Sequence, residues 1–117
     1  MMNIVLYKLC CHAVMITPDY YPLPSTILSM QCKLSLYKTR KELNKLKEDG
    51  LVISCVECLV AEYGNYIMRG YKITKKAEKT IEYKKAYEEE RKIVKEIFGF
   101  DIGSLERKKE MERILES

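Results

Sequence analysis

Residues 24–51, PSTILSMQCKLSLYKTRKELNKLKEDGL, decide the fold of this 117-residue chain, because they read as two short helices joined by a tight turn. Pro24 suits the first turn of the first helix, where its missing N–H costs nothing. Ser35 is a good N-cap for the second helix, which we expect over residues 36–49. Gly50 then ends that helix, since the residue past a helix end often needs a left-handed backbone.

The expected helix over 36–49 has two chemically different faces. Its apolar stripe, at spacings of three and four, consists of Leu36, Thr39, Leu43 and Leu46. Its opposite face is basic and polar, and consists of Tyr37, Lys38, Arg40, Lys41, Asn44 and Lys45. The stripe predicts packing on a core, and the other face is left to meet solvent or a partner.

Strand-forming residues follow the two helices. Residues 52–61 and 66–74 are rich in β-branched and aromatic side chains, and Tyr63-Gly64-Asn65 between them supplies turn chemistry. We therefore expect a β-hairpin, in which Gly70 is a weak point or a bulge. Together with the helices, this hairpin predicts an α+β fold that is mainly α.

Helical patterns flank this central part on both sides. Asn3 can cap a first helix that runs to about Ile16, with apolar residues at helical spacing. After the hairpin, Thr74 is expected to cap a long helix that starts at Lys75 and continues to Phe98.

The chain is expected to divide near residue 80. Residues 1–80 form one compact unit, and residues 81–117 form a helical extension that breaks at 99–103 and ends in a short helix capped by Ser104. The extension carries an apolar cluster of Ile93, Val94, Ile97 and Phe98. This cluster is either ordinary core or a homodimer interface. We favour the homodimer, because an apolar surface outside a complete domain needs a partner.

Three motifs in a fixed order carry a resemblance to a known family. They are Leu-Ser-Met-Gln-Cys-Lys-Leu-Ser at 28–35, Leu43 and Leu46 with Gly-Leu-Val at 50–52, and Gly-Tyr-Lys-Ile-Thr at 70–74. Across roughly residues 3–80 the chain resembles a winged helix-turn-helix domain of the kind found in bacterial transcriptional regulators of the MarR and PadR families. The long C-terminal helix looks more like the PadR arrangement, in which such helices dimerise.

The resemblance implies double-stranded DNA as the partner, with helix 36–49 in the major groove and the hairpin near the minor groove. The residues support the first contact independently, since lysine and arginine neutralise phosphates and side chains such as Asn44 make paired hydrogen bonds to base edges. The candidate DNA-binding residues are Ser35, Tyr37, Lys38, Arg40, Lys41, Asn44, Lys45, Asn65 and Arg69. The hairpin tip is the weaker contact, because it carries Glu62 and no arginine.

Composition and charge narrow the class of protein. With 47% hydrophobic and 32% charged residues the chain is expected to be one folded globular protein, and its net charge of +4 suits a polyanionic partner. The apolar run from Asn3 to Ile16 is too short to cross a bilayer and is no convincing signal peptide. The five cysteines, an odd number among apolar neighbours, fit reduced thiols in a cytoplasmic protein.

Other chemistries find little support in the sequence. The spacing of Cys55 and Cys58 suggests a zinc site. However, residues three apart in a strand point to opposite faces, and His12 is the only histidine that could complete the ligand set. We expect no metal and no cofactor. Cys10 and Cys11 could form a redox sensor, although buried packing thiols are the favoured interpretation. No phosphate loop or nucleophile–base set can be assembled, so we do not expect an enzyme.

Two functions follow as hypotheses. The first is sequence-specific binding of double-stranded DNA by a dimeric transcriptional regulator. The alternative is a winged-helix module for protein–protein interaction in a replication or assembly complex, for which the acidic run at residues 88–90 counts modestly.

Overall fold

The computed structural model describes residues 2–15, 22–61 and 64–116, and at positions 57–61, 65, 66 and 68 it describes the backbone alone. In this part of the chain the fold is α+β and mainly helical, as predicted, with one antiparallel pair of strands. The elements in chain order are α1 (Ile4–Val14), α2 (Ser25–Cys32), α3 (Leu36–Glu48), β1 (Val52–Ala61), β2 (Gly64–Ile73), a 3-10 helix η1 (Lys75–Lys79), α4 (Ile81–Phe98) and α5 (Leu105–Glu116).

The predicted caps of α1 and α3 are confirmed. The side-chain oxygen of Asn3 accepts a hydrogen bond from the Leu6 N–H at 3.1 Å, and Ser35 Oγ accepts one from the Lys38 N–H at 3.1 Å. Pro24 differs slightly from the prediction, because it is the extended N-cap of α2 and not its first helical residue.

The turn between α2 and α3 depends on a left-handed residue. Lys33 has φ 56°, the only positive φ among the described non-glycine residues. The N–H groups of Lys33 and Leu34 then bond back to the carbonyls of Met30 and Ser29, at 3.3 and 3.1 Å. This closure satisfies the free carbonyls at the end of α2 and sets the angle at which α3 leaves it. Gly50, with φ 75°, ends α3 as predicted.

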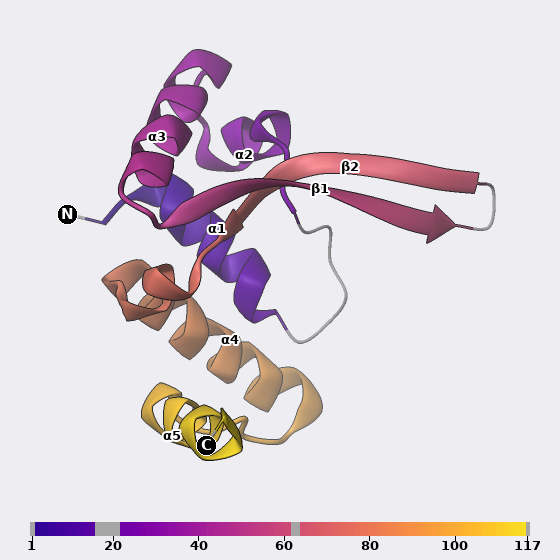
Figure 1. Cartoon of the computed structure of the whole chain (residues 1–117). Coiled ribbons are helices and arrows are strands. Elements are labelled where there is room, and N and C mark those ends of the chain that lie inside the picture. Colours follow the sequence, from indigo (N-terminus) through magenta and orange to yellow (C-terminus); the bar gives the residue numbers. More distant parts are fainter. Residues whose placement is uncertain (1, 16–21, 62–63, 117) are drawn as a thin grey trace.

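The hairpin pairs without interruption from Val52↔Ile73 to Ala61↔Gly64. The prediction that the second strand starts at residue 66 is therefore wrong, because this register extends the strand back to Gly64 and leaves only residues 62–63 between the strands. The two strands form an arm that extends well beyond the helices (Figure 1). We call this hairpin, residues 52–73, the arm.

Gly70 lies in the regular register opposite Cys55, so the bulge predicted there is absent. The backbone of Leu23 crosses β2 at this point and exchanges hydrogen bonds with Tyr71 at 3.1 and 2.9 Å. A Cβ atom on residue 70 would lie 2.7 Å from the Leu23 carbonyl carbon. Glycine is therefore required by the close approach of a second backbone segment.

The core surrounds α1, which lies between the α2–α3 pair on one side and α4 on the other (Figure 1). Fully buried or nearly buried apolar side chains come from every one of these helices and from the base of the arm. They are Val5, Leu6, Leu9, Cys10, Leu23, Leu28, Leu43, Leu46, Val52, Ala77, Tyr83, Ala86, Tyr87 and Leu105. α4 thus shares one core with α1–α3 across residue 80, and the domain boundary predicted there stays a prediction.

The long helix predicted from Lys75 is wrong in its first turns. Residues Lys75–Lys79 form η1, and the extended backbone of Thr80 then separates η1 from α4. Thr80 Oγ1 accepts a hydrogen bond from the Tyr83 N–H at 3.3 Å and so caps α4. After this break, α4 packs along α1 (Figure 1), and its Tyr87 hydroxyl donates to the Gly103 carbonyl at 3.0 Å, next to α5.

The C-terminal helix α5 follows the predicted break, where Gly99 and Gly103 both have left-handed backbones. Ser104 Oγ accepts a hydrogen bond from the Arg107 N–H at 3.2 Å, which confirms the predicted cap. Lys108 donates to the Tyr83 hydroxyl at 3.1 Å and thereby fastens α5 to α4. None of the helices described is long and apolar enough to cross a membrane.

Candidate nucleic-acid interface

The two faces of α3 have the environments that its sequence predicts. Thr39, Leu43 and Leu46 are buried, and the Thr39 hydroxyl also donates to the Ser35 carbonyl at 2.9 Å. Leu36, predicted for the same stripe, is only partly buried. Exposed to solvent are Ser35, Tyr37, Lys38, Arg40, Lys41, Asn44 and Lys45. α3 is therefore held from one side only, and its outer face is free to meet a partner.

The outer face of α3 is strongly basic. The helix carries five basic and two acidic residues. One of the acids, Glu42, is partly buried and accepts a hydrogen bond from the Asn3 side chain at 3.2 Å, so it faces α1 and away from the basic residues. Lys47 is exposed as well and was missing from the predicted set. Its position three residues after Asn44 and seven after Arg40, on the same side of the helix as both, was the available signal.

Two neighbouring elements extend the basic face of α3. Arg40 donates to the hydroxyl of Ser25, the first residue of α2, at 3.5 Å. Ser25 also lines an open pocket of about 470 Å³ together with Arg69 of β2 and Ser54 of β1. Arg69 is exposed. Cationic groups from α3 and from the arm thus border the same hydroxyl-rich surface at the start of α2.

The predicted contact at the arm tip is only partly described. Asn65 belongs to the backbone of β2, where it pairs with Val60, but its side chain lies outside the described residues. Glu62 and Tyr63 lie outside them as well. Arg69 sits opposite Val56, nearer the base of the arm than the tip. The structure therefore groups Arg69 with α2 and α3 and leaves the contribution of Asn65 a prediction.

The cysteines near α1 are poorly suited to redox sensing. Burial raises the pKa of the Cys10 thiol to about 12, and burial also raises the pKa of Cys11 and Cys32. A thiol with a raised pKa stays protonated at neutral pH and is a weak nucleophile. These side chains are better explained as packing groups. The side chain of Cys58, the second cysteine of the zinc interpretation, lies outside the described residues.

The acidic run at residues 88–90 is largely engaged within the chain. Glu88 lies 3.7 Å from Arg91, and Glu89 accepts a hydrogen bond from the Tyr7 hydroxyl and lies 3.8 Å from Lys85. Glu90 is buried. The run therefore offers a partner less negative surface than its sequence suggests, which weakens one argument for the protein-interaction hypothesis.

Of the four residues predicted to form the dimer surface on α4, the fold buries one and leaves three exposed. Val94 is completely buried within the chain, because it points toward the core. Ile93, Ile97 and Phe98 remain exposed, by 47%, 68% and 52%. Phe100 extends this surface, and its ring centroid lies 6.2 Å from that of Phe98. The exposed apolar surface at the C-terminal end of α4 therefore consists of Ile93, Ile97 and Phe98, with Phe100 just beyond the helix and without Val94.

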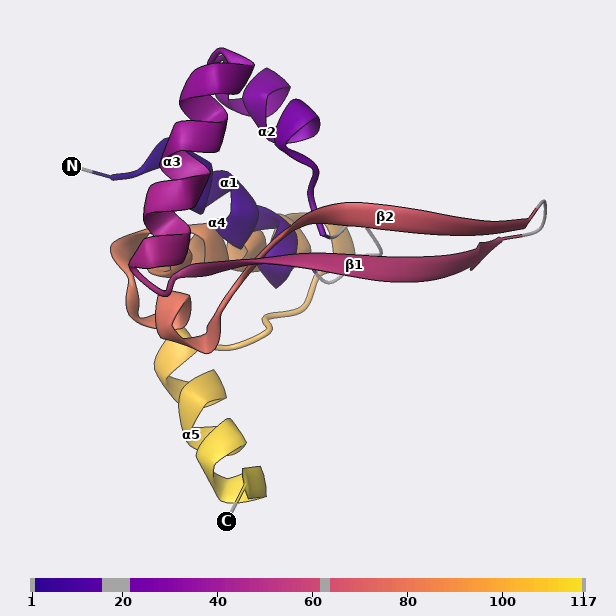
Figure 2. The same cartoon turned by 45° about the horizontal axis from the view of Figure 1, so that its top comes forward.

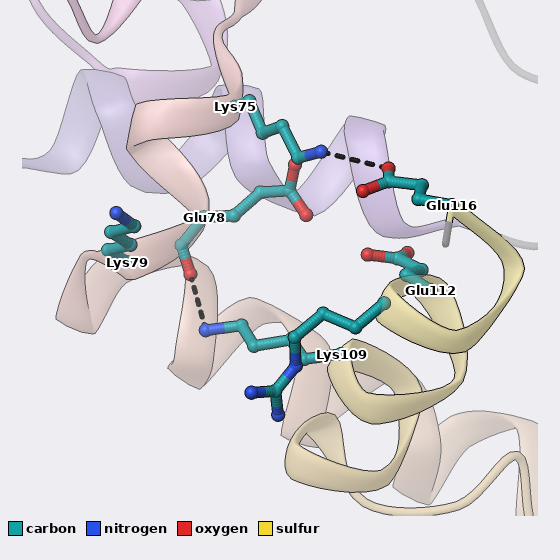
Figure 3. A pocket seen from close by; sticks show the side chains of 7 residues that line it. Lys75, Glu78, Lys79, Lys109, Glu112 and Glu116 are labelled. Atoms are coloured by element: carbon teal, nitrogen blue, oxygen red, sulfur yellow. Dashed lines mark hydrogen bonds and ion pairs between the residues drawn. The ribbon is translucent and has the colours of Figure 1, made fainter.

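A pocket of about 370 Å³ lies between η1 and α5 and is lined by charged side chains (Figure 3). Lys75 forms an ion pair with Glu116 at 3.0 Å, and Lys109 donates to the Glu78 carbonyl at 3.2 Å. These contacts join the two elements across the pocket. We interpret it as the place where α5 is attached to η1, since Lys75 already pairs with Glu116 across it.

Comparison of the chain with models of known protein families finds none that matches. Comparison with curated protein sequences finds no significant match either. Functional arguments for this chain therefore rest on its own residues and their arrangement.

Proposed function

We propose that this protein binds double-stranded DNA sequence-specifically as a winged helix-turn-helix transcriptional regulator, with α3 in the major groove. The observation that carries the proposal is the exposed basic face of α3, backed by a buried stripe and preceded by a tight turn from α2. A helix that enters a groove must project from its domain in this way, because the major groove accepts little more than one helix. In Figure 2, α3 runs along the outside of the molecule.

The exposed residues predicted to bind DNA each have a part in this proposal, whereas Glu48, which is also exposed near the end of α3, has none. Lys38, Lys41, Lys45 and Lys47 neutralise phosphates, which gives affinity that depends on salt. Arg40 and Asn44 carry the planar groups that form paired hydrogen bonds with guanine and adenine. Tyr37 and Ser35, at the start of the helix, suit a phosphate or a thymine methyl group.

Arg69 adds a contact from the arm, where it borders the same surface as Ser25 of α2. We therefore place the DNA contact of the arm near its base. A homodimer is part of this proposal, since two copies would present two α3 helices to the half-sites of a palindrome. The exposed surface of α4 is the candidate for its interface.

The test is a titration of duplex DNA with the full chain at several salt concentrations. We expect Lys41→Ala/Lys45→Ala to weaken binding to all sequences and to lower the salt slope by about two, since each phosphate contact contributes about 0.9. Lys79→Ala/Lys84→Ala removes the same charge from exposed positions off α3 and should leave the slope nearly unchanged. If the wild-type protein shows no salt-dependent binding, the proposal is wrong.

The protein-interaction hypothesis keeps one specific observation in its favour, the exposed apolar residues of the arm. Val56 and Ile67 are exposed by 62% and 70%. Measuring the mass of the protein with and without duplex DNA separates the two hypotheses. A complex that forms only with DNA supports the regulator, whereas DNA-independent assembly with other proteins and no DNA complex would support the interaction module.

A further inference from the structure

The C-terminal end of α3 is hydrogen-bonded to the segment that follows the arm. The hydroxyl of Thr74 donates to the Gly50 carbonyl at 2.6 Å, and the Thr74 N–H donates to the Leu51 carbonyl at 2.9 Å. The Lys76 ammonium group donates to the Asp49 carbonyl at 2.8 Å. Three consecutive carbonyls at the end of α3 thus accept hydrogen bonds from Thr74 and Lys76. We call these two residues the clamp.

The side chain of Thr74 bonds to α3 and not to its own helix. Thr74 precedes η1, where a threonine hydroxyl commonly accepts a hydrogen bond from the first turn, but no such bond forms here. Thr80, which precedes α4, does cap its helix in that way. The Thr74 hydroxyl reaches a carbonyl 24 positions earlier in the chain. It therefore joins two separate elements, α3 and η1.

Lys76 suits the end of α3 in both charge and shape. Carbonyl groups at a helix C-terminus carry partial negative charge, which an ammonium group stabilises. The aliphatic part of Lys76 lies over Gly50, where a Cβ atom would be 3.7 Å from Lys76 Cδ. Lys75 and Lys79 of the same 3-10 helix, by contrast, line the pocket toward α5. η1 therefore presents one of its lysines to α3 and the others to α5.

The two ends of α3 are held by directional bonds, whereas its middle is held by apolar packing. Its first turn follows the closed turn from α2, and its last residues meet the clamp. Leu43 and Leu46 lie between and are buried, but apolar burial is non-directional and constrains the tilt of a helix less than hydrogen bonds do. In Figure 2 the end of α3 lies beside η1 at the base of the arm. The clamp thus fixes the tilt of α3 relative to the arm.

We propose that Thr74 and Lys76 are positioning residues, which hold α3 at the tilt from which it discriminates between DNA sequences. Paired hydrogen bonds to base edges require a helix to lie within about 0.5 Å and about 10–20° of one geometry, whereas flexible lysines reach phosphates over a wider range. The inference rests on the proposed function, but neither residue contacts DNA in it. Loss of the clamp therefore reduces discrimination more than it reduces nonspecific affinity.

The first experiment compares the affinities of the full chain for two duplexes. The wild type selects a preferred duplex from a random library, and a shuffled duplex of equal length and composition is the nonspecific probe. Thr74→Val/Lys76→Met should lower the ratio of the two affinities by about tenfold, the size of one lost base contact. Thr74→Ser keeps the hydroxyl and should keep the wild-type ratio. Lys79→Met, at an exposed position of the same 3-10 helix, is the matched control and should also keep it.

The ratio of affinities separates positioning from stability. A variant that only unfolds more easily loses active protein, so both affinities fall by the same factor and the ratio stays constant. Lys76→Met alone changes an exposed position and should lower the ratio by a smaller factor than the double variant. If Lys76 contacted a phosphate, the salt slope would also fall by about 0.9. An unchanged ratio in the double variant, or a reduced salt slope in Lys76→Met, overturns the inference.

Residual dipolar couplings, measured by NMR on the protein without DNA, report the orientation of α3 separately. In Thr74→Val/Lys76→Met we expect the couplings of the α3 amides to change relative to those of α1, while Lys79→Met leaves them unchanged. Couplings of α3 that keep their wild-type values in the double variant overturn the inference, even if DNA binding is normal. If the wild type binds no DNA, the proposed function is wrong, and the couplings still decide whether the clamp orients α3.

Discussion

The outer face of α3 and the outer half of the arm are both exposed and lie close together in the chain, yet their chemistry is opposite. α3 carries five basic residues over Leu36–Glu48, whereas residues 56–67 of the arm carry none. The inner face of α3 is anchored by Leu43 and Leu46, while the outer arm has no such anchor among its described side chains. The two neighbouring exposed surfaces therefore differ in charge, since α3 is basic and residues 56–67 contain no basic residue.

The largest expected effect on stability comes from removing a buried side chain that packs α3 on the core. Leu43 is completely buried, so Leu43→Ala should lower the free energy of unfolding by about 2–5 kcal/mol. Val56→Ala on the exposed arm should change it by less than about 0.5 kcal/mol under dilute, monomeric conditions. Urea denaturation followed by circular dichroism measures both. Equal losses would mean that the arm is anchored as firmly as α3.

The base of the arm is the next most sensitive point. Gly70→Ala places a Cβ atom 2.7 Å from the Leu23 backbone, which cannot move without losing its pairing with Tyr71. We expect a loss of about 1–3 kcal/mol in the free energy of unfolding. Ser54→Ala, at an exposed position of the neighbouring strand, is the control and should be nearly neutral. A stable Gly70→Ala variant would contradict the close approach.

A smaller and more selective effect is expected from Asn44, which sits among the lysines of α3 but carries no charge. Asn44→Ala should reduce discrimination at one base pair of the preferred site by about tenfold, within the range of one paired hydrogen bond. Its salt slope should match that of the wild type, because no phosphate contact is lost. Binding to a panel of single-base variants of the site measures this. Equal weakening on every sequence would assign Asn44 to the backbone instead.

The smallest expected effect concerns the loop that carries Phe100 beside the apolar surface of α4. Arg91 donates to Asp101 at 2.7 and 2.9 Å, and this ion pair holds the pKa of the Asp101 carboxyl well below its usual range. The stabilisation is present above the ordinary aspartate pKa of about 3.9 and is lost as the pH falls toward the lowered value. Asp101→Asn should therefore lower the melting temperature slightly at pH 7, and the difference should shrink below pH 4. A difference independent of pH would assign the effect to packing.

Local features of this fold could be predicted because short-range chemistry decides them. The caps Asn3, Ser35 and Ser104 and the stop at Gly50 follow from which side chains and backbones satisfy helix ends. The exposed set on α3 follows from helical periodicity, since the buried stripe leaves the other residues outside. The errors have another origin. η1 was not predicted because the break at Thr80 accompanies the packing of α4 on α1, which lies far from it in the chain. Of the two interpretations of Gly70, a weak point or a bulge, the bulge is absent, and the close approach of Leu23 could not be predicted because Leu23 is distant in the chain.

The sequence by itself determined the α+β class of the fold, the two helices and the turn within residues 24–51, and the basic character of α3, since periodicity, capping and charge are properties of contiguous residues. Only the tertiary structure decided that Val94 belongs to the core while Ile93 and Ile97 do not, that Arg69 shares a surface with Ser25, and that Val56 and Ile67 of the arm are exposed. The physical reason is that burial and proximity depend on how elements pack against one another, and that packing joins residues which no sequence pattern places together.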